Sequence, residues 1–215
     1  FPLALAHVRK TVSPSGYRGL RAFDSLSLAR SERDEQTHFG LPVIPFEEIE
    51  HHYPPEKYGL FIPIGYRDVN QLRRERYEMG KQKQYNFATY VSSRASTWPD
   101  LSVGENSLIY EHAVIQPFAE IDKNTIIRSG AHVSHHALVG DHCFIAAHAV
   151  IAGNAKVQDQ CFLGLNSTIR DNISIAPGCI IAAGALVLND TEENGVYVGV
   201  PAVKLKKPAS ELNLE

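Results

Sequence analysis

The sequence has few cysteines, no surplus of basic residues and no long apolar run, and each absence excludes a class of protein. Three cysteines are too few for a disulfide-stabilised scaffold and favour a reducing compartment. No stretch of about 18 apolar residues occurs, so no transmembrane span is expected. The formal net charge of −3 gives no reason to expect nucleic acid as a partner. We therefore expect a cytoplasmic globular protein, and because the chain begins with Phe1 we expect its N-terminus to be incomplete.

The first part of the chain also lacks the glycine motif of dinucleotide-binding folds. No G-x-G-x-x-G turn is present, so a dinucleotide site is not supported. Residues 1–88 instead alternate short apolar segments with charged ones. The pattern predicts strands over 21–24 and 58–65, a turn, short strand and helix start over 40–49, and a helix over 70–83. This alternation is typical of a small α/β sheet.

A six-residue repeat organises the next part of the chain. From Leu101 to Asp190 the sequence divides into fifteen hexads without an insertion, beginning LSVGEN, SLIYEH and AVIQPF. The third letter is aliphatic in all fifteen, the first is Ala, Ser, Thr or Cys in thirteen, and the sixth is Asn, Gly or Asp in nine. Two weaker hexads precede them over 89–100. A period of six fits neither a helix nor a single strand.

The hexad matches a triangular coil in which each side is a short strand and each corner a tight turn. The third letter points inward, the small first letter fits the corner, and the sixth letter accepts a left-handed backbone. We therefore predict a mainly β fold: a hexapeptide left-handed parallel β-helix over 89–190, with three hexads per coil. A small α/β, partial Rossmann-like domain over 1–88 precedes it, and a capping loop and tail over 191–215 follow.

The repeat accounts for the three cysteines and for four of the ten histidines. Cys143, Cys161 and Cys179 are 18 residues apart at the first letter, so we expect them to stack as small buried core residues, with no metal or redox role. Four of the ten histidines occupy the sixth letter, where a left-handed backbone favours His, and a structural role is expected for them. These four are His112, His136, His142 and His148.

His135 differs because it stands at the fifth letter, where its ring projects outward beside a turn. Residues 18 apart stack along the outside of the coils, which places Gly153 next to His135. A glycine there leaves room and a bare N–H for an acyl oxygen. A neighbouring fifth-letter column is smooth and mostly apolar, and suits either the pantetheine arm of coenzyme A or a contact within a trimer. That column contains Ser129, Ala147, Leu165 and Ala183.

The chain resembles the bacterial sugar acyltransferases that include sialic acid O-acetyltransferases and UDP-4-amino-sugar N-acetyltransferases. The resemblance covers roughly residues 18–205 and is most specific in HVSHHALVGDHCFIAAHAVIAGNAKVQDQCFLGLNSTI. It also includes GLPVIPFEEI, FIPIGYRDVNQLRRERY and GVYVGVPAVK. Members of this family are homotrimers in which a nucleotide-sugar-binding α/β domain precedes a left-handed β-helix. The resemblance therefore implies an acetyl-CoA-dependent acetyltransferase without a metal cofactor, which acts on an amino or hydroxyl group of a nucleotide-linked sugar in surface-polysaccharide biosynthesis.

The resemblance also implies roles for individual residues. His135 aligns with the general base of the family, Gly153 with the amide that receives the acyl carbonyl, and Leu165 and Ala183 with coenzyme contacts. The apolar column adds Ala147 to the coenzyme contacts. We expect the nucleotide sugar at the end of the 58–65 strand, where Gly65, Tyr66 and Arg67 lie.

Two features depart from the family and two other functions stay open. The opening strand with a glycine-rich turn is missing, and His136 stands where many N-acetyltransferases of this type carry Glu. A backbone carbonyl or an acid of a neighbouring subunit could therefore orient His135. His112 and His148 share a column two coils apart, which keeps a zinc enzyme like the gamma-class carbonic anhydrases open. The other alternative is a non-catalytic β-helix scaffold.

Overall fold

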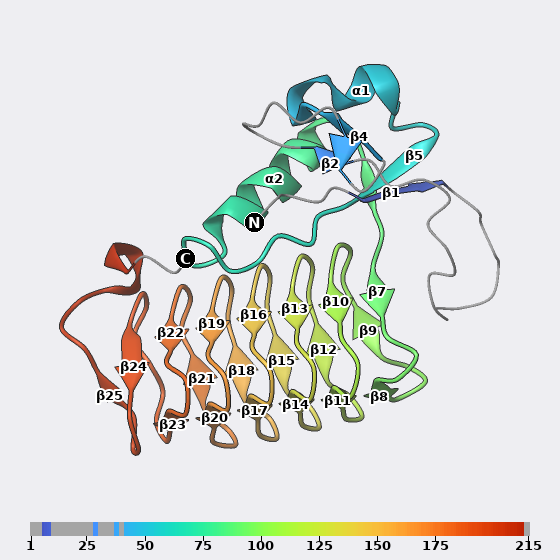
Figure 1. Cartoon of the computed structure of the whole chain (residues 1–215). Helices are drawn as coiled ribbons and strands as arrows, with labels where there is room; N and C mark the ends of the chain where they lie inside the picture. Colours follow the sequence, from blue (N-terminus) through green and yellow to red (C-terminus); the bar gives the residue numbers. More distant parts are fainter. Residues whose placement is uncertain (1–5, 10–27, 30–36, 39–40, 213–215) are drawn as a thin grey trace.

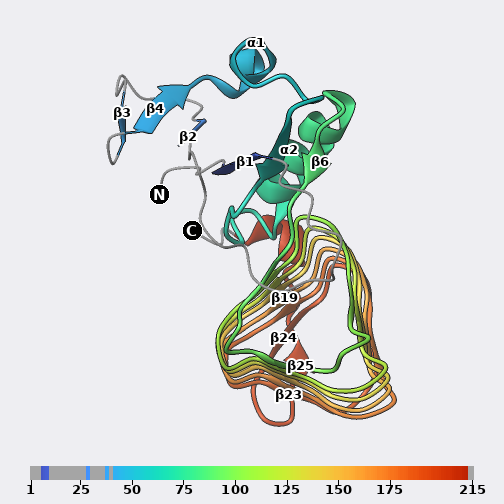
Figure 2. The same ribbon diagram turned by 90° about the vertical axis from the view of Figure 1, so that its right-hand side faces the viewer.

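The computed structural model describes residues 6–9, 28–29, 37–38 and 41–212. An N-terminal α/β unit lies along one side of a long β-helix, and the coils of the β-helix stack regularly from β7 to β24 (Figure 1). Seen along its axis the β-helix is a triangle (Figure 2). The expected strand over 21–24 lies outside the described residues.

Each side of the triangle is one parallel sheet of short strands. The first sheet contains β7 (Tyr90–Val91), β10 (Leu108–Ile109), β13 (Ile126–Ile127), β16 (Phe144–Ile145), β19 (Phe162–Leu163) and β22 (Ile180–Ile181). The second contains β8 (Ser96–Thr97), β11 (Val114–Ile115), β14 (His132–Val133), β17 (Val150–Ile151), β20 (Thr168–Ile169) and β23 (Leu186–Val187). The third contains β9 (Ser102–Val103), β12 (Glu120–Ile121), β15 (Leu138–Val139), β18 (Lys156–Val157) and β21 (Ser174–Ile175).

The predicted left-handed parallel β-helix is confirmed, and the hexad letters play their expected parts. Paired residues are 18 apart in sequence, as in Leu108 opposite Ile126. From Asn106 to Gly184 every sixth-letter residue has a positive φ, between 54° and 71°. Phe118 is the bulky member of this set, and its ring stays 63% exposed.

The inward-pointing third letters and the small first letters form one continuous core. The stacked cysteines belong to it: Cys143, Cys161 and Cys179 are fully buried and none forms a disulfide. Each thiol donates to a carbonyl of the next turn, at 3.1 to 3.2 Å. Burial raises the pKa of the Cys161 and Cys179 thiols, so both stay protonated at neutral pH.

The N-terminal unit contains a βαβ crossover next to less regular structure. Strand β5 (Tyr58–Phe61) pairs in parallel with β6 (Asn86–Phe87) through α2 (Gln71–Gln82), and in antiparallel with β1 (Ala6–Arg9). Only the β5–α2–β6 part is therefore Rossmann-like. The remaining elements are the small sheet β2 (Leu28–Ala29), β4 (Leu41–Ile44) and β3 (Thr37–His38), with η1 (Phe46–Glu48) and α1 (Ile49–His52).

Two segments differ from the sequence expectation. The strand expected over 58–65 ends at Phe61, because the N–H of Ile62 is donated to the side chain of Asn106 instead of a strand and Pro63 has no N–H. The segment after Asp190 is more than a loop. Its valines form β24 (Val196–Val198), which continues the first sheet, and β25 (Val203–Lys204), before η2 (Ala209–Glu211).

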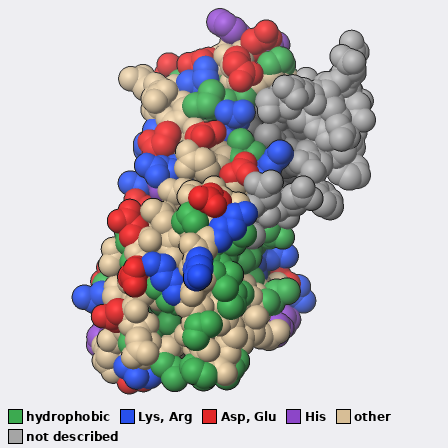
Figure 3. Space-filling view, turned by 90° about the vertical axis from the view of Figure 1, so that its left-hand side faces the viewer, with side chains coloured by type: hydrophobic (Ala, Val, Ile, Leu, Met, Phe, Trp, Pro, Cys, Tyr) green, Lys and Arg blue, Asp and Glu red, His purple; other side chains and the backbone are tan. Residues whose placement is uncertain are grey.

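The C-terminal end of the β-helix exposes apolar side chains beside lysines. Val200 is 70% exposed, Val203 60% and Leu205 39%. Figure 3 faces this end and shows hydrophobic and basic side chains gathered on it. No helix in the described part of the chain is long and apolar enough to cross a membrane.

Arg73 of α2 joins the two units. Its fully buried guanidinium donates 2.8 Å hydrogen bonds to the carbonyls of His142, Cys143 and Gly65, and longer ones to those of Asn124 and Ile64. Burial lowers the pKa of Arg73 to about 9, and carbonyl dipoles rather than a carboxylate compensate the charge. This role could not be predicted from the sequence, because Arg73 lies in a highly charged segment.

A buried ladder of sixth-letter side chains lies under α2. Asn106 donates from Nδ2 to Oδ1 of Asn124 at 2.7 Å, and Nδ2 of Asn124 lies 2.7 Å from Nδ1 of His142. Because an amide nitrogen only donates, Nδ1 of His142 accepts and carries no proton. Its Nε2 faces Glu78 at 3.8 Å. The ladder therefore needs a neutral His142, and the expected structural role of this histidine is confirmed.

Candidate active site

His135 lies at the corner where the second sheet turns into the third, between β14 and β15. Its side chain is exposed, and its backbone N–H donates to Oε1 of Gln116 in the preceding coil at 2.9 Å. Nδ1 of its ring lies 3.2 Å from Nδ1 of His136. The ring therefore projects from the β-helix, as its fifth-letter position predicts, while two neighbours fix its backbone and one ring edge.

Gly153 is the residue on which the His135 ring rests. A Cβ on Gly153 would lie 2.6 Å from Cε1 and 2.8 Å from Nε2 of His135, closer than atoms can approach. Its backbone conformation is one that other residues also adopt. The glycine is therefore needed for the room it leaves to the His135 ring and not for a special φ. Among the described residues its N–H meets no hydrogen-bond acceptor. The corner thus combines an exposed imidazole with the glycine it packs against, whose N–H is unpaired within the described residues.

Two further side chains complete this corner. The rings of Phe118 and His136 lie 4.8 Å apart at 33°, one coil away from each other. The His135 and His136 rings meet edge to face at 5.4 Å. Sequence reasoning missed Gln116 and Phe118, because their contacts with the two histidines arise only from the 18-residue stacking.

The apolar column lies at a different corner, where the first sheet turns into the second. Leu165 is 53% exposed, Ala183 is exposed and Ala147 is half-buried. Ser129 begins the column and donates a hydrogen bond to Glu111, so the apolar part runs from Ala147 onward. The column is therefore a narrow, accessible apolar strip along the edge of the prism.

One chain does not bring this strip to His135. The strand β14 (His132–Val133) and its equivalents separate the two corners, which puts a whole side of the triangle, roughly 15–20 Å, between them. Sequence reasoning placed His135 near the strip, and the topology of a single chain corrects this. The strip of one copy can therefore meet only the His135 of another copy.

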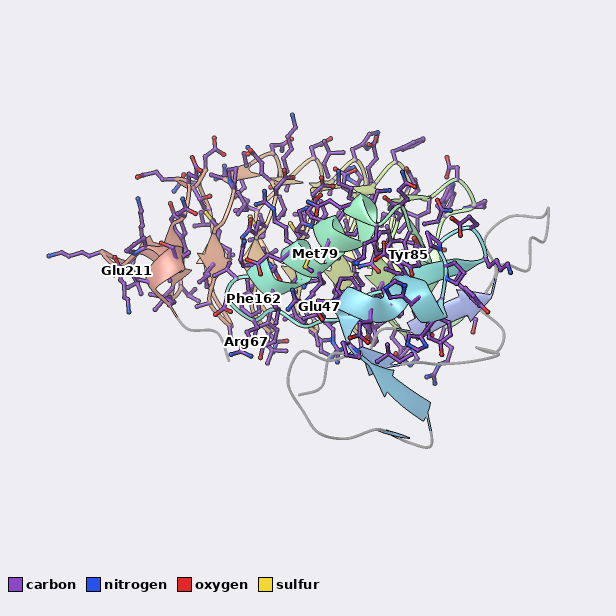
Figure 4. The ribbon with its side chains drawn as sticks, turned by 90° about the horizontal axis from the view of Figure 1, so that it is seen from above. Glu47, Arg67, Met79, Tyr85, Phe162 and Glu211 are labelled. Atoms are coloured by element: carbon purple, nitrogen blue, oxygen red, sulfur yellow. The ribbon has the colours of Figure 1, made fainter. Side chains whose placement is uncertain are left out.

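The residues expected to bind the nucleotide sugar lie where α2 begins. The Tyr66 ring packs 4.9 Å from the rings of Phe144 and Phe162 on the first sheet. Arg67 is exposed, with Nε 3.8 Å from Asp68, and Figure 4 shows it at the same end of α2 as Phe162. Gly65 is also exposed, and its added Cβ would meet no atom. These residues and His135 therefore lie on different sides of one chain.

A left-handed turn connects this segment to α2. Asp68, Val69 and Asn70 have φ values of 51°, 50° and 67°, which is unfavourable for a β-branched valine. The turn is retained because Val69 is buried and Nδ2 of Asn70 donates to the carbonyl of Cys161 at 3.0 Å. The exposed Arg67 thus stands on a rigid rather than a loosely held segment.

The histidines considered for zinc lie at the corner of the apolar strip. A Cβ on Gly130 would lie 2.4 Å from Cε1 of His148, so the His148 ring packs against the glycine that separates it from His112. Within the described residues, no group of three or more His, Cys, Asp or Glu side chains is arranged to hold a metal ion.

Comparison with known proteins agrees with this fold. The profile of the bacterial transferase hexapeptide family (six repeats) matches residues 118–153, which include His135 and Gly153. No curated protein matches the sequence. Among solved structures, the acetyltransferase domain of PglB from Neisseria gonorrhoeae FA1090 is 22% identical and aligns with 81% of this chain and 84% of that chain, with a TM-score of 0.74. The same domain has also been solved in complex with acetyl coenzyme A.

A second relative in structure is PerB from Caulobacter crescentus, solved in complex with CoA and GDP-perosamine. It is 22% identical, with 79% of this chain and 81% of that chain aligned and a TM-score of 0.71. Variants of the GDP-perosamine N-acetyltransferase from that organism have a histidine replaced by alanine or asparagine. The resemblance to hexapeptide-repeat sugar acyltransferases is thus confirmed for the repeat and for the fold.

Proposed function

We propose that the chain is an acetyl-CoA-dependent acetyltransferase that acetylates an amino or hydroxyl group of a nucleotide-linked sugar. One observation carries the proposal: the exposed imidazole of His135 packs against Gly153, whose N–H meets no acceptor among the described residues. This pairing places a base beside a hydrogen-bond donor, which is what acyl transfer needs. The fold shared with PglB and PerB, whose structures hold acetyl coenzyme A or CoA with GDP-perosamine, supports the same reaction.

The reaction would be a direct transfer in which the protein forms no covalent intermediate. His135 accepts a proton from the amine or hydroxyl of the acceptor as that group attacks the thioester carbon. The new N–C or O–C bond forms, and the N–H of Gly153 donates to the carbonyl oxygen as it gains negative charge. The C–S bond then breaks, and the sulfur of coenzyme A takes the proton from His135.

A homotrimer would complete this site. His135 and the strip formed by Ala147, Leu165 and Ala183 lie at different corners of one prism, so the strip of one copy must face the His135 corner of the next. The pantetheine arm would then lie along the strip and deliver its acetyl group between the two copies. A narrow apolar edge with an exposed leucine is also better covered than left in water.

The acceptor would enter from the N-terminal unit. Gly65 offers open backbone, Tyr66 an aromatic ring and Arg67 an exposed cation for a phosphate, all in the segment between β5 and α2. A nucleotide sugar held there is consistent with GDP-perosamine in PerB. Acetylated nucleotide sugars are precursors of bacterial surface polysaccharides, and we infer that the reaction serves this biosynthesis in the cytoplasm.

The direct test is an acetyl-transfer assay with a panel of nucleotide-linked sugars. The purified protein is incubated with acetyl-CoA and with nucleotide sugars that carry a free amine, or only hydroxyl groups, and released thiol is measured. We expect turnover with at least one acceptor and thermal stabilisation by acetyl-CoA. Turnover with none, together with no thermal shift by acetyl-CoA, would contradict the proposal and favour the scaffold alternative.

A further inference from the structure

His135 and His136 share a single proton position between their rings. Their Nδ1 atoms lie 3.2 Å apart. A hydrogen bond between two imidazole nitrogens needs one proton, because two bare nitrogens repel each other and two N–H groups cannot bond. One ring therefore donates, and the other accepts with a bare Nδ1.

The direction of this hydrogen bond decides whether His135 can act as a base. A neutral imidazole carries one ring proton. If His135 donates from Nδ1, its Nε2 is bare and can take a proton, and Nε2 is one of the ring atoms that lie against Gly153. If His136 donates instead, His135 carries its proton on Nε2 and has no lone pair there. Only the first arrangement suits the proposed reaction.

We propose that His136 is a positioning residue that holds His135 in the tautomer with a bare Nε2. This inference rests on the function proposed above and concerns the residue that replaces the family's Glu. His136 must itself stay neutral, because an imidazolium has no acceptor nitrogen. The site is therefore active only when both rings are neutral, and two protons must leave the pair as the pH rises.

Neighbouring residues hold the ring of His136 in place. The adjacent turns contribute no further titrating side chain to the pair. The Phe118 ring, in the preceding coil, lies 4.8 Å from the His136 ring. The residues of the preceding and following turns that pack against the pair are all uncharged: Gln116, Pro117, Phe118, Ala152, Gly153 and Asn154. The first charged residue along the column of His135 and Gly153 is Asp171, which lies one coil beyond Gly153.

Three substitutions of His136 change the group that faces Nδ1 of His135, and all three residues tolerate the left-handed backbone at position 136. His136→Asn provides a neutral acceptor that does not titrate, His136→Asp a charged acceptor, and His136→Gly no acceptor. For each protein kcat/KM is measured against pH with one acceptor. Titration of the acceptor's own amine contributes equally to all four profiles, so differences between them belong to the pair.

On the acidic limb of the profile, log kcat/KM of the wild type should rise with a slope against pH that is one unit greater than that of His136→Asn, because one more proton must leave. Above this limb His136→Asn should retain activity within about threefold. In His136→Asp the limb should shift to higher pH, because a carboxylate stabilises the His135 imidazolium. His136→Gly should lose about tenfold or more at all pH values, since the tautomer is no longer held. A wild-type limb no steeper than that of His136→Asn, or a fully active His136→Gly, would overturn the proposal.

A second measurement does not depend on activity. Nitrogen NMR of histidine-labelled protein distinguishes a proton on Nδ1 from one on Nε2, and the His135→Asn and His136→Asn variants together identify the His135 signals. At high pH we expect His135 to carry its proton on Nδ1 in the wild type and on Nε2 in His136→Gly. If every acceptor fails but this tautomer is found, the proposed function fails and the pairing stands. A proton on Nε2 in the wild type would overturn the positioning role whatever the activity.

Discussion

At the residue scale, the shape of the site depends on the absence of one side chain. The His135 ring occupies the space that a side chain at Gly153 would fill. Together the two residues bring an imidazole against a glycine whose N–H meets no acceptor among the described residues. His135 could be selected from sequence because its fifth-letter position points outward. Gln116 and Phe118 could not, because only the stacking of coils brings them to the histidines.

Gly153→Ala should therefore disable the site while leaving the fold intact. The new Cβ would lie 2.6 Å from Cε1 of His135 and force the ring to rotate away. The backbone at Gly153 is open to alanine, so the melting temperature should change by only a few degrees. We expect turnover to fall by about 10²-fold, the effect of misplacing a catalytic group by about 1 Å. An alanine variant with unchanged turnover would show that the ring position is not needed.

At the element scale, a buried cation, Arg73, is the central contact between α2 and the β-helix. Arg73 reaches backbone carbonyls on both units, while the adjacent Arg74 lies at the surface and bonds only Gln160, at 2.7 Å. This arrangement could not be predicted from sequence, because neighbouring arginines in a charged helix look alike. Their difference arises from carbonyls that lie about 50 and 70 residues further along the chain.

Arg73→Met should lower the free energy of unfolding by about 3–5 kcal/mol, because it leaves several buried carbonyls without a donor. Arg74→Met is the matched control and should cost about 0.5 kcal/mol or less. Urea unfolding of the two variants beside the wild type measures the difference. Similar midpoints for both variants would mean that Arg73 does not hold the two units together.

The ladder under α2 predicts a pH dependence of stability. Burial lowers the pKa of His142 to about 4, so between about pH 6.5 and pH 4 the unfolded chain binds a proton that the folded chain does not. The contribution of neutral His142 to the free energy of unfolding is therefore complete above pH 6.5 and is lost as the pH falls toward 4. His142→Asn, the residue found at this place in the two preceding coils, should remove this part of the acid destabilisation.

Urea unfolding of the wild type and His142→Asn at several pH values between 4 and 7 provides the comparison. The difference in unfolding free energy between the two proteins should change in favour of the variant as the pH falls. A difference that stays constant over this range would show that folding does not change proton binding by His142.

At the scale of the whole molecule, the β-helix was predictable and the joint to the N-terminal unit was not. Each hexad position has a local structural requirement, such as the inward-pointing aliphatic side chain of Ile109 or the left-handed backbone of Asn106. Fifteen repetitions of these requirements make the pattern clear in the sequence. The end of β5 depends instead on Asn106, a residue 44 positions further along that takes the N–H of Ile62. Such contacts have no signature in the local sequence.

The proposed homotrimer is a prediction at the same scale. The strip with Leu165 and the corner with His135 lie on different edges of one prism, so the site is complete only when copies associate. Light scattering coupled to size-exclusion chromatography should give three times the chain mass of 23.8 kDa. A single species with the mass of one chain would contradict both the trimer and the shared site.

The most direct test of the account is the turnover of His135→Asn. Asparagine keeps a polar group at this position but cannot accept the acceptor's proton, so turnover should fall by about 10²–10⁴-fold, the usual contribution of a general base. Coenzyme A should still bind, because the proposed strip contributed by another copy is unchanged. His136→Asn, which keeps a neutral acceptor beside His135, should cost far less. A fully active His135→Asn, or a His136→Asn that is inactive in its place, would contradict the assignment of His135 as the base.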